Sequence, residues 1–133
     1  MRRILQGERV STDGQYVRLT DVQLERAPQI VPPVLLGVMG AKSVVVAGTC
    51  ADGLLVLEHS GPEYVQWARD MLAESRSAAG RSGTAHLVVY ANCVVIEQDP
   101  AAARAEMRRL IAAHNADGPQ ATVARMPFAS EMA

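Results

Sequence analysis

The sequence predicts an α/β protein built on a parallel sheet. Three apolar runs, at 34–38, 53–57 and 86–96, lack the polar–apolar alternation of a half-exposed strand and are typical of strands buried on both faces. Apolar residues at helical spacing follow each run. Strands that alternate with helices in this way form parallel sheets with right-handed crossovers. We therefore expect three strand–helix units in succession.

A hairpin and a loop are predicted ahead of these units. Asp13-Gly14 lies between two runs of β-branched and apolar residues, which is a strong short-range signal of a hairpin. Residues 21–33 are polar and punctuated by prolines, so we expect a loop that leads into the first strand. The first helix is expected over residues 41–50, directly after Gly40.

The other two helices carry start and stop signals. Ser60-Gly61-Pro62-Glu63 supplies a cap candidate, a proline in the first turn and an acid near the positive end of the helix dipole. Gly80 suits the position that ends this helix in a left-handed conformation. Asp99-Pro100 begins the last helix, which carries an apolar face as far as residue 114.

Length and composition fit one globular domain over residues 1–133. The chain is 49% hydrophobic and 20% charged, a balance typical of a folded protein rather than a disordered one. We divide it into a hairpin and loop at 1–30, a βαβαβα segment at 31–116 and an irregular tail at 117–133.

Charge and cysteine usage exclude several classes of function. The formal net charge is −1, so the chain lacks the excess of basic residues that is typical of proteins that bind nucleic acid or an anionic membrane surface. Prolines and charged residues interrupt the longest apolar stretch, at 30–57, so we expect no membrane span. Cys50 and Cys93 form neither a metal-spaced cluster nor a disulfide framework. We expect a cytoplasmic protein with no metal site.

Two groups of residues at the ends of predicted strands are candidates for a binding site. Gly37-Val38-Met39-Gly40 opens a helix, whose unpaired N–H groups and dipole suit a phosphate, and glycine lets the backbone approach an anion closely. The alternative is a tight turn without a ligand. Glu58 and His59 follow the next strand. His59 is a candidate acid–base group or phosphate ligand, Glu58 would repel a phosphate, and the alternative is a solvated loop.

Five short motifs, in order, resemble the C-terminal part of the luciferase-like monooxygenase superfamily. They are Asp13-Gly14-Gln15-Tyr16; the stretch 32–42 with Ala47-Gly48; Ala51-Asp52-Gly53; Pro62-Glu63-Tyr64-Val65 with Ala79-Gly80-Arg81; and Asp99-Pro100 with Ala103-Arg104. Members of that superfamily are flavin- or coenzyme F420-dependent oxidoreductases with (β/α)8 barrels.

The resemblance implies a partial TIM-type (β/α) barrel, with three parallel strands, three helices and an N-terminal β-hairpin. It also implies F420 or FMN as cofactor, with its phosphate-bearing tail at Gly37, Val38, Met39 and Gly40 and with Glu58 and His59 near it. Met39 departs from the family, because many relatives have a glycine at that position.

A complete barrel takes about 250 residues, whereas this chain has 133. Five strand–helix units are missing, together with most groups that would hold the cofactor ring. We therefore expect oxidoreductase activity only when another chain, or a second copy, completes the barrel, and the apolar strands predict self-association. The alternatives are a truncated non-catalytic binding or interaction module and a small stand-alone binder of phosphate ligands.

Overall fold

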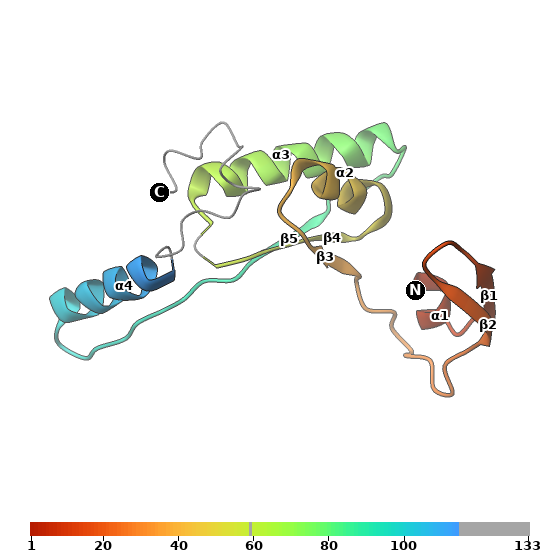
Figure 1. Ribbon diagram of the computed structural model, residues 1–133, viewed down its shortest axis with the longest axis horizontal. Helices are drawn as coiled ribbons and strands as arrows, with labels where there is room; N and C mark the ends of the chain where they lie inside the picture. The colour runs from red at the N-terminus through yellow and green to blue at the C-terminus, as the bar shows by residue number, and fades with distance from the viewer. Residues whose placement is uncertain (59, 115–133) are drawn as a thin grey trace. The chain divides into compact units, whose positions relative to one another are not determined.

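The structure is a computed structural model that describes residues 1–58 and 60–114 (Figure 1). Contacts divide the chain into two units, residues 1–34 and residues 35 onward, each of which is described by itself. The single domain over 1–133 stays a prediction, and the predicted tail at 117–133 lies outside the described residues. None of the described helices is long and apolar enough to span a membrane.

The first unit contains the predicted hairpin. Strands β1 (Val10–Asp13) and β2 (Arg18–Val22) pair antiparallel, and the Gly14 amide closes the turn by donating to the Val17 carbonyl oxygen at 3.0 Å. A short helix, α1 (Arg2–Leu5), precedes them and was not predicted. Four residues are too few to show a helical period, which explains why the sequence pattern gave no sign of it.

The second unit contains the predicted parallel sheet. Its strands β3 (Leu35–Gly37), β4 (Gly53–Val56) and β5 (His86–Val89) lie in the order β3-β4-β5. Helices α2 (Ala41–Cys50) and α3 (Pro62–Ala78) connect these strands and pack against each other and against β4. Helix α4 (Pro100–His114) follows β5. The α/β class and the partial-barrel pattern of three strands, three helices and a hairpin are confirmed.

The core of this unit lies between β4 and the two helices that cover it. Successive residues of a strand face opposite sides of the sheet, so Leu54 and Val56 share the side that α2 and α3 cover. Both side chains are fully buried. The remaining buried apolar residues come from the helices and the turn between α2 and β4: Val44, Ala47, Ala51, Tyr64, Ala68 and Leu72.

Strand β5 is shorter than the predicted run of 86–96. Its ladder with β4 ends at the pair Val56–Val89, and the Tyr90 amide then donates to the Val56 carbonyl oxygen at 3.0 Å. Because β4 ends at Val56, the described sheet offers no strand beside residues 91–96. Sequence alone shows that these residues favour a strand, but the neighbour decides where the ladder stops.

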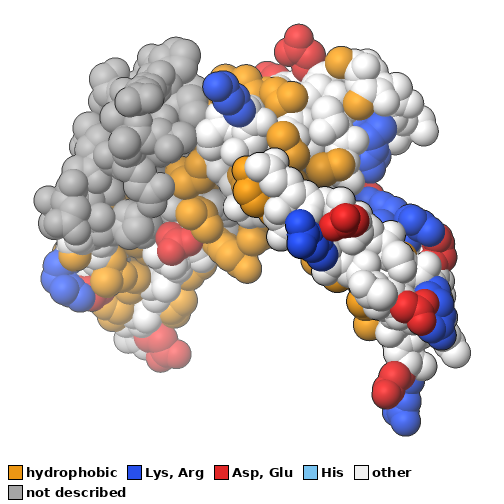
Figure 2. Space-filling model, turned by 45° about the vertical axis from the view of Figure 1, so that its right-hand side comes forward, with side chains coloured by type: hydrophobic (Ala, Val, Ile, Leu, Met, Phe, Trp, Pro, Cys, Tyr) orange, Lys and Arg blue, Asp and Glu red, His pale blue; other side chains and the backbone are white. Residues whose placement is uncertain are grey.

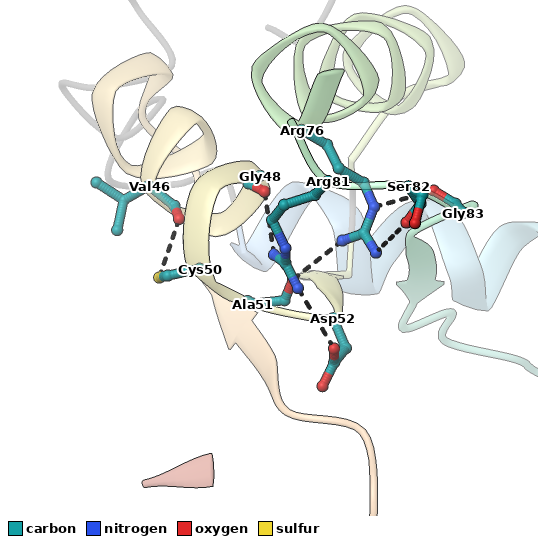
Figure 3. A network of polar contacts seen from close by, with 9 residues as sticks. All are labelled: Val46, Gly48, Cys50, Ala51, Asp52, Arg76, Arg81, Ser82 and Gly83. Atoms are coloured by element: carbon teal, nitrogen blue, oxygen red, sulfur yellow. Dashed lines mark hydrogen bonds and ion pairs between the residues drawn. The ribbon is translucent and has the colours of Figure 1, made fainter. Parts of the chain in front are cut away.

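Two arginines join α2, α3 and the loops at the amino ends of β4 and β5 (Figure 3). Arg81 donates to the carbonyl oxygens of Gly48, at 3.1 Å, and of Ala51. Arg76 donates to Ala51, Ser82 and Gly83. The contacts to Gly48 and Ala51 satisfy carbonyl groups at the C-terminal end of α2, which the helix itself leaves unpaired.

Arg81→Ala is expected to lower the free energy of unfolding by about 2 kcal/mol, the typical size of hydrogen bonds to a charged group. Arg81 also lies 3.6 Å from Asp52, and both side chains are less than a quarter exposed. Arg69→Ala is the matched control, because Arg69 and its partner Asp70 are both about 60% exposed; the expected change is within about 0.5 kcal/mol. Urea unfolding of the two variants measures the difference. Equal losses would contradict a capping role for Arg81.

Candidate functional site

The two groups of candidate residues follow neighbouring parallel strands. Gly37 pairs with Leu55, so the loop after β3 and the loop after β4 lie at the same edge of the sheet. The structure thereby places Gly37–Gly40 and Glu58 at one edge. His59 lies outside the described residues. In parallel α/β folds this carboxyl edge is the side on which ligands bind.

The two glycines of the first group end β3 and begin α2 at this edge. Gly40 is the N-cap of α2 and has an extended conformation, with φ −73° and ψ 147°, that any residue adopts. Its carbonyl oxygen accepts the Ser43 and Val44 amides, and no side chain caps the helix. A Cβ on Gly37 would lie 3.8 Å from Leu55, which is an ordinary contact. Neither backbone conformation at Gly40 nor packing at Gly37 therefore demands glycine.

Tyr64 holds this loop against the core. Its ring is fully buried, and its hydroxyl donates to the Met39 carbonyl oxygen at 2.9 Å. The Trp67 ring packs against it, with the ring centroids 5.4 Å apart. The sequence pattern places Tyr64 on the apolar face of α3 but does not reveal the hydroxyl contact, because Met39 lies 25 positions away.

The burial of Tyr64 should make the free energy of unfolding depend on pH. Burial raises the pKa of Tyr64 from 10.0 to about 12, so the folded state keeps the phenol proton at a pH where the unfolded state releases it. The free energy of unfolding should therefore fall as the pH rises from 10 to 12, by up to about 2.7 kcal/mol.

Chemical unfolding at several pH values measures this slope. Tyr64→Phe should remove the tyrosine contribution to it, whereas Tyr16→Phe should not, because Tyr16 is 90% exposed. An unchanged slope in Tyr64→Phe would contradict the assignment.

Two further polar residues lie at the carboxyl edge. Lys42, the single lysine of the chain, is exposed in the first turn of α2. A cation there opposes the helix dipole, and an anion at the helix end would relieve that opposition. The Ser60 hydroxyl, in the loop after β4, is buried without a hydrogen-bond partner among the described residues. The stretch 60–63 was predicted to supply a cap for α3. In the structure Gly61 is the N-cap, and neither Ser60 nor any other side chain caps the helix.

The described residues at this edge supply donors for an anion. The α2 amides, the Lys42 ammonium and the Ser60 hydroxyl are the donors that a phosphate accepts from. The half-buried Glu58 is the opposing charge. Among the described residues no group of three or more His, Cys, Asp or Glu is placed to hold a metal ion.

A pocket of about 270 Å³ lies elsewhere, beside α3 and the start of β5. Its lining includes Arg69, Arg76 and Arg81. The guanidinium groups of Arg76 and Arg81 already bind the backbone carbonyls described above, so the pocket belongs to the packing of the fold.

Comparisons of sequence identify the relatives of this chain. The model of the family "luciferase-like monooxygenase" matches residues 1–131. An F420-dependent hydroxymycolic acid dehydrogenase of Mycobacterium tuberculosis is 30% identical over 113 residues, which cover 79% of this chain and 29% of the relative. A 5,10-methylenetetrahydromethanopterin reductase of Methanolobus tindarius is 27% identical over 126 residues, covering 94% of this chain and 38% of the relative.

Solved structures agree with these matches. A coenzyme F420-dependent tetrahydromethanopterin reductase from Methanopyrus kandleri superposes with a TM-score of 0.65 at 27% identity, over 85% of this chain and 33% of that protein. The monooxygenase RslO1 from Streptomyces bottropensis, at 22% identity and a TM-score of 0.61, shares the fold over 87% of this chain and 36% of its own. The chain thus spans about a third of the length of these relatives. Motifs, parallel strand order and matched length together place it in the luciferase-like monooxygenase family.

Proposed function

We propose that the chain is the part of an F420-dependent oxidoreductase that binds the phosphate-bearing tail of the cofactor. The observation that carries the proposal is the uncapped N-terminus of α2, which Tyr64 fixes and which lies beside Lys42. The names of two relatives, F420-dependent in each case, favour F420 over FMN, which is the second candidate.

In this proposal the backbone at Gly37, Val38, Met39 and Gly40 receives the phosphate, and Lys42 and Ser60 add donors. When bound, a deazaflavin or flavin supplies the hydride-transfer chemistry. Glu58 is the charge that opposes the anion, and His59 keeps its predicted role as an acid–base group or phosphate ligand. Three strands provide only part of a barrel mouth, so the chain acts when further strands complete it.

The test compares the isolated chain with the chain co-expressed with the five missing strand–helix units of a relative. F420 and FMN are titrated into each, and binding is followed by fluorescence. We expect binding and turnover in the completed barrel and no turnover in the isolated chain, whose cofactor ring would remain in solvent.

Two variants assign the binding to the loop. Gly40→Val and Lys42→Ala should each weaken cofactor binding about tenfold or more, the loss of roughly 1.4 kcal/mol. Lys42→Ala should keep the unfolding midpoint, because Lys42 is exposed. Gly40→Val should also lower the midpoint, because valine is disfavoured at the N-cap of a helix. Arg69→Ala, at an exposed position of α3 outside this loop, is the control that should change neither folding nor binding. Equal binding by all variants would refute the site.

The alternative function is a non-catalytic binding or interaction module. A completed barrel that folds but binds neither F420 nor FMN would favour it, whereas phosphate binding by the isolated chain would favour a stand-alone phosphate binder. The proposal also places the chain in the cytoplasm, where exposed thiols such as those of Cys50 and Cys93 stay reduced.

Self-association is part of the proposal for the isolated chain. Figure 2 shows apolar side chains, in orange, on the visible surface. Exposed large apolar residues of the second unit include Val45, Val46, Val88, Val89 and Val95. Soluble monomers expose few such residues in contiguous patches, so light scattering of the isolated chain should give the mass of an oligomer.

A further inference from the structure

A hydrogen bond to the backbone joins the buried tyrosine of α3 to the loop before α2. The Tyr64 hydroxyl donates to the Met39 carbonyl oxygen at 2.9 Å, and the Tyr64 ring is fully buried. Met39 directly precedes Gly40, the N-cap of α2. The hydroxyl therefore acts on the peptide unit that joins Met39 to Gly40, at the point where the helix begins.

The hydrogen bond fixes the direction of this peptide unit. No peptide bond between the described residues is cis. In a planar trans peptide the carbonyl oxygen and the N–H group point in opposite directions. Because the Met39 carbonyl oxygen points at the buried Tyr64 hydroxyl, the Gly40 N–H group points away from it.

The Gly40 amide is available to a ligand at the carboxyl edge of the sheet. Over residues 1–58 and 60–114, neither the Gly40 amide nor the Ala41 amide has a hydrogen-bond partner. A helix leaves its first N–H groups unpaired, and such groups donate to anions at the helix end. The direction of the Gly40 amide therefore decides whether it can join the Ala41 amide in contacting one phosphate.

Packing holds both ends of the hydrogen bond in place. The Trp67 ring lies against the Tyr64 ring, with the centroids 5.4 Å apart, and the Met39 side chain packs against the core that contains Tyr64. The peptide unit is thus oriented before any ligand arrives. A donor that is already oriented binds an anion more tightly than one that must first be ordered.

We propose that Tyr64 is a positioning residue, whose hydroxyl turns the Gly40 amide toward the phosphate of the bound cofactor. Because Tyr64 is fully buried, it acts through the Met39 carbonyl group and not by contact with the anion. The inference rests on the proposed function. It adds a residue from outside the loop that determines how tightly the loop binds.

Tyr64→Phe tests this role in the completed barrel described above. The ring remains, so the core stays packed, but the Met39 carbonyl oxygen loses its donor. F420 binding should weaken about tenfold, the loss of one hydrogen bond to a charged group. Ser75→Ala is the matched control, because it also removes a buried hydroxyl of α3, which donates to the Met71 carbonyl oxygen at 2.8 Å. Its position is about three turns from Tyr64, so F420 binding should be unchanged.

The Gly40 amide proton gives a readout that a loss of stability alone does not move. In protein labelled with ¹⁵N-glycine, the Gly40 signal is identified by its absence in Gly40→Ala. F420 should shift this signal downfield in the unchanged chain, because the amide donates to a charged acceptor. At saturation with F420 the shift should be smaller in Tyr64→Phe and unchanged in Ser75→Ala. Circular dichroism establishes that each variant is folded.

The outcomes separate this inference from the proposed function. If the unchanged completed barrel binds no F420, the proposed function fails and the inference fails with it. If that barrel binds F420, the positioning role alone is refuted by equal affinity in Tyr64→Phe, by equal losses in Tyr64→Phe and Ser75→Ala, or by a Gly40 signal that F420 does not move. The last measurement needs no change at Tyr64, so it decides the question even where Tyr64→Phe fails to fold.

Discussion

Gly53→Ala should lower the free energy of unfolding of the second unit by about 3 kcal/mol, the upper part of the range for overpacked sites. Gly53 is the first residue of the central strand β4 and pairs with His86 of β5. A Cβ at this position would lie 2.1 Å from the His86 carbonyl oxygen and 2.8 Å from its carbonyl carbon. These are backbone atoms, so no side-chain rotation relieves the clash, and the two strands must separate.

Gly37→Ala is the matched control for this substitution. It lies in β3 of the same sheet, where a Cβ would meet only the Leu55 side chain at 3.8 Å. Alanine also reduces the freedom of the unfolded chain, so stability should be unchanged or slightly higher, by up to about 1 kcal/mol. Urea unfolding followed by circular dichroism compares the two. Similar stabilities would show that β4 and β5 approach each other less closely than the structure describes.

Much of the second unit follows from local sequence. The apolar runs predict β3 and β4, and the starts of α2 and α3 lie where Gly40 and the Gly61-Pro62 pair indicate. Gly80 ends α3 with φ +67°, as its position predicts. Such signals depend on neighbours within a few residues, so a single sequence contains them.

Features that depend on distant residues could not be predicted in this way. The length of β5 is set by the end of β4. The Met39 carbonyl oxygen accepts a hydrogen bond from Tyr64, which lies 25 positions away in α3. The same holds for the site. Gly37–Gly40 is visible as a pattern. The burial of the Ser60 hydroxyl, which has no hydrogen-bond partner among the described residues, becomes visible only once the loop after β4 is folded. Ala47-Gly48 belongs to a family motif, but the motif does not explain why position 48 is glycine. The close contact between α2 and α3 explains it.

Gly48 lies where α2 crosses α3, and Gly48→Ala should destabilise the second unit by about 2 kcal/mol. A Cβ on Gly48 would lie 1.9 Å from the Ser75 Oγ, 2.8 Å from the Ser75 Cβ and 3.0 Å from the Arg76 amide nitrogen. Alanine favours a helix over glycine by about 1 kcal/mol. The clash outweighs this gain because both helices are buried at the crossing and neither can move without opening the core.

A second substitution at Ser75 separates this clash from a loss of helix structure. Ser75→Gly removes both side-chain atoms that a Cβ at position 48 would meet, so Gly48→Ala with Ser75→Gly should be more stable than the sum of the single effects predicts, by about 1–2 kcal/mol. Ser75→Ala is the matched control, since it removes Oγ but keeps the Cβ at 2.8 Å, and it should restore less. Unfolding of the three single and two double variants gives both coupling energies. Additive effects in both pairs would mean that α2 and α3 do not meet through Gly48 and Ser75, because a steric contact between two positions must appear as coupling between them.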